Sequence, residues 1–177
     1  MKEKPAAPAR TDDLARGALA GAAAALVWAA QQPLDKRLFG SRYDDVELLG
    51  KLVTRDGPWV PVGLALHAFN GALFGATLAL VRPVLPGSPV GQALGAAMAE
   101  NVALWPLGRL SDRFHPARRE LPRLTGNRRA FAQATWRHAL FGVVLGLLVR
   151  RRGSDRLEPG GDVLVPGGAG ERVAPLQ

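Results

Sequence analysis

Charged residues are missing from long stretches of this chain, and this pattern predicts where its helices lie. No Asp, Glu, Lys or Arg occurs at residues 17–34 or 57–81. Two further apolar stretches carry one charge each, Glu100 in the first and Arg137 in the second. About 20 predominantly apolar residues suffice to cross a bilayer as a helix. The pattern therefore predicts four membrane-spanning helices, over about 14–32, 60–81, 90–107 and 130–149.

The same apolar motifs occur twice along the chain. HAFNGALFG at 67–75 recurs as HALFGVVLG at 138–146, and GALAGAAAA at 17–25 recurs as GQALGAAMA at 91–99. The two matches are offset by 71 and 74 residues, so the order and spacing of the motifs are kept. We interpret this as a tandem duplication of one helix–loop–helix hairpin. The repeats cover 14–82 and 90–150.

These patterns predict an all-α fold, an integral membrane four-helix bundle built from two tandem hairpin repeats. Residues 14–149 form the transmembrane domain. We expect 1–13 to be a mobile polar tail and 153–177, rich in Gly and Pro, to be disordered. Because each repeat crosses the membrane twice, both hairpins face the same way. The long loops 34–59 and 108–129 should then lie on the same side.

Two sequence features refine the predicted helices of the first hairpin. Pro33 follows the first apolar stretch, and proline interrupts the hydrogen bonds of a helix, so we expect this helix to end near Gln32. In the loop that follows, apolar residues alternate with polar ones at helical spacing over 46–53. This spacing predicts a short amphipathic helix at the membrane interface.

Each predicted membrane helix carries a Gly-x-x-x-Gly pattern, which is typical of close backbone contact between membrane helices. With 21 Gly in the chain some such patterns arise by chance, but these four occupy matching places in both repeats. We predict helix-packing roles for Gly17, Gly21, Gly71, Gly75, Gly91, Gly95, Gly142 and Gly146.

Composition narrows the class of protein. A soluble bundle would need polar outer faces, and the Ala-rich first helix has none. The net charge of +8 comes without a nucleic-acid-binding motif, so basic residues beside membrane helices are better matched to anionic lipid head groups. The absence of cysteine excludes disulfides and thiolate chemistry. No motif for a nucleophile, a nucleotide or a cofactor is present, and we expect no cofactor.

Polar residues inside the apolar stretches are the candidate functional residues, because ionisable groups in a bilayer cost a few kcal/mol each. At 1.5 Å per residue, His67, Glu100 and His138 fall about 10–12 Å from the loop side. Within about one turn of that level lie Asn70, Asn101, Gln133 and Arg137. This predicted polar layer consists of His67, Asn70, Glu100, Asn101, Arg137 and His138.

Three interpretations of the polar layer are compatible with the sequence. In the first it is structural, with Glu100 paired to Arg137 and the other side chains bridging helices. In the second it is a proton or ion pathway through His67, Glu100 and His138. The third, a metal site made of the two imidazoles and the carboxylate, has no ligand-spacing motif behind it, and we predict no metal.

The segments GALAG at 17–21 and PLDKR at 33–37, followed by helices with embedded His67 and His138, resemble the YagU-like bacterial inner-membrane proteins. The resemblance implies a small multi-pass protein of the bacterial cytoplasmic membrane and carries over no functional residue. We expect a non-enzymatic scaffold or subunit that associates through its Gly-x-x-x-Gly faces. Its expected partners are the lipid bilayer and a second copy or another membrane protein, not nucleic acid. The alternative function is a small transporter or channel.

Overall fold

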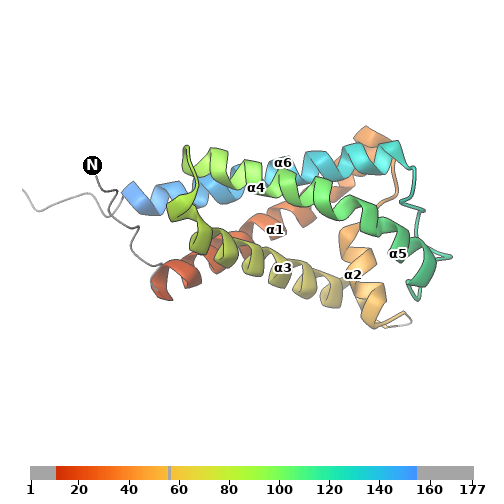
Figure 1. The fold of residues 1–177 in the computed structure, drawn as a ribbon. Coiled ribbons are helices and arrows are strands. Elements are labelled where there is room, and N and C mark those ends of the chain that lie inside the picture. Colours follow the sequence, from red (N-terminus) through yellow and green to blue (C-terminus); the bar gives the residue numbers. More distant parts are fainter. Residues whose placement is uncertain (1–10, 56, 155–177) are drawn as a thin grey trace, which may run out of the picture.

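The computed structural model describes residues 11–55 and 57–154, and every element in this part of the chain is helical. The all-α prediction is therefore confirmed (Figure 1). Of the predicted tails, residues 1–10 and 155–177 lie outside the described residues, whereas Thr11 already begins the first helix. The elements are α1 (Thr11–Phe39), α2 (Asp45–Val53), α3 (Trp59–Val81), η1 (Arg82–Val84), α4 (Pro89–Leu104), η2 (Trp105–Leu107), α5 (Gly108–Phe114) and α6 (Arg128–Ser154).

Three of the described helices are long and apolar enough to cross a membrane. They are α1, α3 together with η1, and α6 as far as Arg150. Large apolar side chains cover their outer surfaces, among them Leu19 at 64% exposure and Leu73 at 59%, as expected of helices that face lipid. The fourth predicted span, α4, has 16 residues and is about 24 Å long, less than the roughly 30 Å of a hydrocarbon core.

The long helices pack in the order α3, α1, α6, α4, with α1 in contact with both α3 and α6. Each hairpin thus pairs its own two helices, and α1 and α6 join one hairpin to the other. In the described part of the chain, α3 and α4 barely touch. All four long helices contribute to one apolar core, consisting of Ala20, Ala24, Ala25, Trp28, Leu78, Ala93, Ala97, Phe141 and Leu145.

The crossing of α1 and α3 is made by glycine backbones. A Cβ atom built on Gly21 would lie 2.0 Å from the carbonyl oxygen of Gly71, and one on Gly75 would lie 2.0 Å from that of Gly17. No side chain fits at these distances, so the absence of a Cβ is what lets the two helices approach so closely. The structure therefore brings together the four predicted packing glycines of the first hairpin.

The second hairpin packs differently from the prediction. Gly142 and Gly146 of α6 lie against the backbone of α4. Gly91 and Gly95 of α4, however, face away from α6, and nothing lies within 4 Å of a Cβ built on Gly95. The packing role predicted for Gly91 and Gly95 is wrong within this chain. The physical reason is that α4 turns its alanine stripe inward instead, since Ala93 and Ala97 are fully buried in the core.

The predicted end of the first helix is also wrong. Helix α1 continues through Pro33, whose ring is exposed, and ends at Phe39. Gly40 then adopts a left-handed φ of +57°, and the amide of Ser41 donates to the carbonyl of Lys36 at 3.2 Å. This is the usual glycine-terminated helix end. The two extra turns carry Asp35 into the protein interior, where it is 1% exposed.

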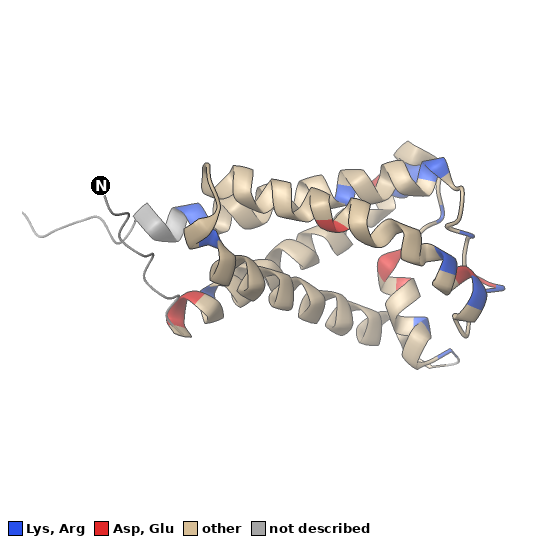
Figure 2. Ribbon diagram, in the orientation of Figure 1, with Lys and Arg blue, Asp and Glu red and all other residues tan. Residues whose placement is uncertain are grey.

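The two long loops meet at one end of the molecule, where charged residues gather (Figure 2). Helix α2 is the predicted amphipathic helix; Asp44 caps its first turn by accepting from the amide of Glu47 at 3.0 Å. From the second loop, the Nε2 of His115 donates to the carbonyl of Leu48 at 2.9 Å, while its Nδ1 accepts from the amide of Ala117. Both loops thus form one connected layer, at the end opposite the short η1 turn (Figure 1).

Replacing Gly71 by leucine should destabilise the protein strongly, because its Cβ alone would lie 2.5 Å from the carbonyl oxygen of Gly21. Overpacking of this kind costs about 1–3 kcal/mol or more. Ala65→Leu is the matched control, since Ala65 is a small exposed residue on the same helix. Unfolding midpoints in detergent measure both variants. Equal midpoints for the two variants would show that the α1–α3 crossing does not depend on backbone contact.

Candidate functional site

A fully buried ion pair links the two hairpins. Arg137, on α6, is 0% exposed and meets the carboxylate of Asp35, on α1, through two parallel hydrogen bonds. The Nε atom donates to Oδ2 and the Nη2 atom donates to Oδ1, each at 2.6 Å. This bidentate arrangement gives the strongest hydrogen bonding that a guanidinium forms with a carboxylate.

The same guanidinium reaches a third segment of the chain. Its Nη1 donates to Oδ2 of Asp45, at the start of α2, at 2.6 Å, and its Nη2 also donates to the carbonyl of Tyr43 at 3.2 Å. Arg137 therefore has partners on α1, on α2 and in the segment between them. We call Asp35, Tyr43, Asp45, Gln133 and Arg137 the ionic cluster.

Neutral donors complete the coordination of Asp35. The Gln133 side chain, one turn before Arg137 on α6, donates to its Oδ1 at 2.6 Å. The side chain of Gln31, one turn before Asp35 on α1, donates to its Oδ2 at 2.5 Å. The Asp35 carboxylate thus accepts four hydrogen bonds in a place without access to solvent. Such full satisfaction is what keeps a buried charge tolerable.

Asp45 is held by aromatic donors in addition to Arg137. The indole of Trp28 donates to its Oδ2 at 3.2 Å, and the hydroxyl of Tyr43 donates to its Oδ1. Burial by itself raises the pKa of Asp45, but Arg137 and the Tyr43 hydroxyl bring this pKa below its ordinary value. Burial, followed by the charge of Asp45, raises the pKa of Tyr43 well above its ordinary value. Asp45 is therefore a carboxylate and Tyr43 a protonated donor at neutral pH.

The charges of this region do not cancel. Beside the ionic cluster, Lys36 forms an ion pair with Asp44. Three carboxylates, those of Asp35, Asp44 and Asp45, therefore lie next to two cations, Lys36 and Arg137. The remaining negative charge is stabilised by the neutral donors of the glutamine, tyrosine and tryptophan side chains.

The histidines of both predicted repeats, His67 and His138, pack against the ring of Trp28. The ring of Trp28 lies 5.0 Å from that of His67 and 4.7 Å from that of His138, edge to face in both cases. His138 donates from Nδ1 to the carbonyl of Ala134 at 2.8 Å, and its Nε2 lies 3.9 Å from Glu100. In the described part of the chain, the buried Nε2 of His67 has no hydrogen-bond partner.

The expected pairing of Glu100 with Arg137 is wrong. All three donor groups of Arg137 are directed toward α1, α2 and the segment between them. The Glu100 side chain is 38% exposed on α4 and lies 3.9 Å from His138. The remaining members of the predicted polar layer are also divided. Asn101 is buried and donates to the hydroxyl of Thr135 at 3.0 Å, but Asn70 is exposed on α3.

Sequence reasoning missed the carboxylates that Arg137 binds, because it assigned Asp35 and Asp45 to a loop. A signal for Asp35 exists in the sequence. Trp28, Gln32 and Asp35 follow one another at spacings of four and three residues, which place them on one face of a continuous helix, and all three are buried. No comparable pattern marks Asp45. Among the described residues, no group of three or more His, Cys, Asp or Glu side chains is arranged to hold a metal ion.

Replacing Arg137 by glutamine should lower the free energy of unfolding by about 3–5 kcal/mol, because it leaves the buried carboxylate of Asp35 and the partly buried one of Asp45 without their cation. Arg137→Lys should recover only part of the lost free energy of unfolding, since an ammonium cannot form the bidentate contact. Glu100→Gln is the matched control and should cost far less, because Glu100 is outside the ionic cluster. Denaturation in detergent measures all three variants, and a Glu100→Gln loss as large as that of Arg137→Gln would contradict the assignment.

The chemistry of the site is that of a closed network, in which each charged group is engaged by another group of the same chain. It joins α1, α2 and α6 and leaves the guanidinium of Arg137 enclosed. Comparisons with protein-family models, with curated proteins and with solved structures find no match to this chain.

Proposed function

We propose that this chain is a non-enzymatic subunit of the bacterial cytoplasmic membrane, built from two duplicated hairpins, that assembles with a second copy of itself. One observation carries the proposal. The outward face of α4 presents small residues every fourth position, and in the described structure this face is uncovered. Its residues are Gly91, Gly95, Ala99 and Ala103.

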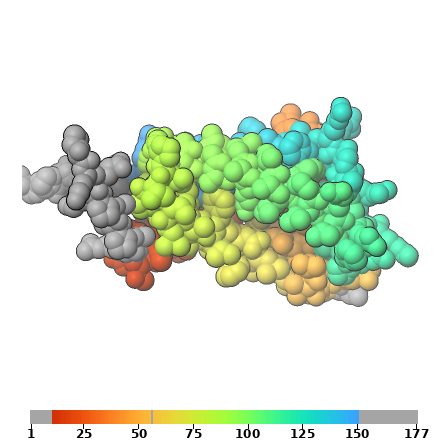
Figure 3. Space-filling model, viewed as in Figure 1, coloured from red at the N-terminus to blue at the C-terminus, as the bar shows by residue number. Residues whose placement is uncertain are grey.

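The first hairpin supports this interpretation, because the corresponding small-residue face of α1 is packed against another helix. Gly17 and Gly21 of α1 match Gly91 and Gly95 in the sequence repeat, and both are buried against the backbone of α3. Small residues drive association of helices in lipid because they allow close packing, while larger apolar side chains gain nothing over contact with lipid tails. Helix α4 forms much of the outer surface in Figure 3, so a second copy has access to it.

A second copy is the simplest partner for this face. The stripe of small residues on α4 can pack against the same stripe of a second copy related by a two-fold axis. Two-fold symmetry is the commonest symmetry of protein oligomers. The ionic cluster supports a structural, non-enzymatic role in the same account. Arg137 and Asp35 direct their polar groups at each other and at neighbouring acceptors and donors, so no group of this pair is left for a substrate.

We infer that α4 and η2 together form a fourth crossing. Together they extend from Pro89 to Leu107 without a break, and at the rises of an α-helix and a 3-10 helix they measure about 30 Å, the thickness of a hydrocarbon core. The even number of crossings then places both long loops on one side of the membrane.

Cysteine labelling tests the fourth crossing, because the native chain has no cysteine. We expect Arg42→Cys and Arg118→Cys to be labelled from one side of sealed vesicles by a membrane-impermeant reagent, and Ser88→Cys to be labelled only from the other. All three positions are exposed in the structure. Labelling of positions 42 and 118 from opposite sides would contradict the two-hairpin topology.

Crosslinking tests the assembly. We expect Ala99→Cys to form a disulfide between two copies in a bilayer, and adding Gly95→Leu to reduce its yield at least fivefold by separating the helices. Ala65→Leu, an exposed small residue on α3, is the matched control and should leave the yield unchanged. Equal yields with and without Gly95→Leu would contradict association through α4.

A second candidate function is a small proton transporter or channel. The observation that favours it is the buried, unpartnered Nε2 of His67 beside a region with more carboxylates than cations. Proton flux into proteoliposomes would support this candidate if the His67→Asn variant abolishes it. The control variant Asn70→Ala, on the exposed face of the same helix, should leave the flux unchanged. Flux equal to that of empty liposomes would contradict it.

A further inference from the structure

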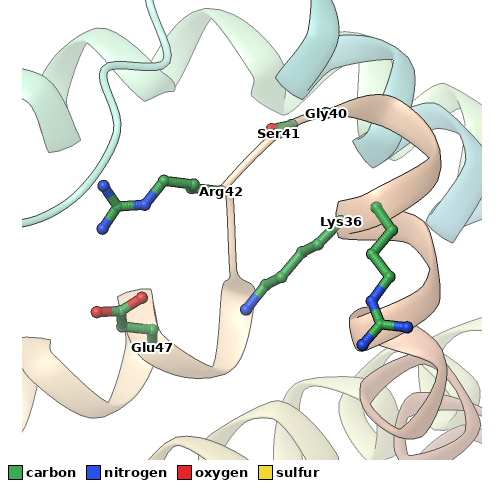
Figure 4. Close-up of a pocket in the computed structure, with 6 residues that line it drawn as sticks. Lys36, Gly40, Ser41, Arg42 and Glu47 are labelled. Carbon is green, nitrogen blue, oxygen red and sulfur yellow. The ribbon is translucent and has the colours of Figure 1, made fainter.

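A basic pocket of about 410 Å³ lies beside the last turn of α1, where the chain turns toward α2 (Figure 4). The close-up shows Lys36 projecting from α1 into the bend of the chain and Arg42 projecting from the extended segment that closes the bend. This pocket is separate from the ionic cluster. Its lining residues are Lys36, Arg37, Gly40, Ser41, Arg42 and Glu47.

The pocket has free positive charge after its internal ion pairs are formed. Lys36 pairs with Asp44, and Glu47 is neutralised by Lys51 at 2.8 Å. Arg37 and Arg42 remain, both exposed and without an ion-pair partner in the described part of the chain.

A third guanidinium lies at the edge of the same pocket. A Cβ built on Gly40 would lie 3.4 Å from Nη1 of Arg129, so this arginine of α6 approaches the backbone of the pocket. Arg129 also has no ion-pair partner among the described residues. Two guanidinium groups, those of Arg37 and Arg42, therefore line the pocket, and a third, that of Arg129, lies beside its Gly40 backbone.

The position of the pocket relative to the apolar surface suggests the source of the anion. Leu34 and Leu38 are 68% and 70% exposed on the last turns of α1, as expected of side chains that face lipid. Arg37 lies within one turn of both on the same helix, and Arg42 follows a few residues later. Basic side chains at this boundary meet the phosphate groups of the adjoining leaflet.

We propose that this pocket binds a phosphate group, supplied by the head group of an anionic phospholipid. Guanidinium groups match phosphate oxygens by two-pronged hydrogen bonds as well as by charge, and a net negative lipid gains more from unpaired cations than a zwitterionic one. The inference goes beyond the proposed assembly, because α4 takes no part in this pocket.

Thermal unfolding of the full chain in a non-ionic detergent tests the site, with dihexanoyl phosphatidylglycerol, dihexanoyl phosphatidylcholine and inorganic phosphate as probes. We expect phosphatidylglycerol to raise the unfolding midpoint, and its apparent Kd to increase about tenfold in the Arg37→Gln/Arg42→Gln variant. Arg118→Gln/Arg119→Gln removes the same charge from exposed positions of the second loop and should leave the Kd unchanged. The unliganded midpoints should be equal, because neither pair forms an ion pair in the described structure.

Each other outcome overturns a defined part of the inference. Equal losses of affinity in the two double variants would mean that overall charge, and not this pocket, binds the lipid. Equal protection by phosphatidylcholine would overturn the selectivity for an anionic lipid. Equal protection by inorganic phosphate, lost in the Arg37→Gln/Arg42→Gln variant, would assign the pocket to soluble phosphate and overturn the lipid source.

Discussion

A guanidinium in a helix long and apolar enough to cross a membrane has to be neutralised where it lies, and much of the loop end of this protein follows from that constraint. Arg137 lies more than two turns inside α6 and is fully buried. The cost of such a charge is a few kcal/mol at least. Its two carboxylates come from α1 and α2, so the chain must carry α1 past Pro33, turn at Gly40 and begin α2 at Asp45 for the charge to be matched.

Close backbone contact organises the rest of the helical structure. The glycines of α1 and α3 bring these two helices together, and Gly142 and Gly146 do the same for α6 against the backbone of α4. Because lipid tails are as apolar as leucine side chains, such packing is a main source of attraction between membrane helices. Helix α1 takes part in both the glycine packing and the ion pair. Gly17 and Gly21 contact α3, and Asp35 binds Arg137 of α6. Helix α1 is therefore the element that holds the two hairpins together.

Sequence patterns predicted the helical class and α2, because these depend on local apolar spacing. They predicted four spans, of which three are long and apolar enough in the structure to cross a membrane. The site depended on details that such spacing leaves open. Treating Pro33 as a helix end removed Asp35 from consideration, although its spacing from Trp28 fits a continuous helix. The orientation of α4 could not be predicted from its own residues: both the Gly91–Gly95 face and the Ala93–Ala97 face are small and apolar, and the packing against Phe141 and Gly142 decides between them. That choice also turned Glu100 away from Arg137.

The central claim is that Asp35 and Arg137 act as one unit that joins the hairpins. A double-mutant cycle with Asp35→Asn and Arg137→Gln, measured as free energies of unfolding in detergent, tests it most directly. Arg137→Gln leaves the buried Asp35 without its cation, and Asp35→Asn removes one of the two carboxylates of Arg137. The account therefore predicts that the double variant loses less than the sum of the two, with an interaction energy of about 1–3 kcal/mol. Losses that simply add would contradict the account.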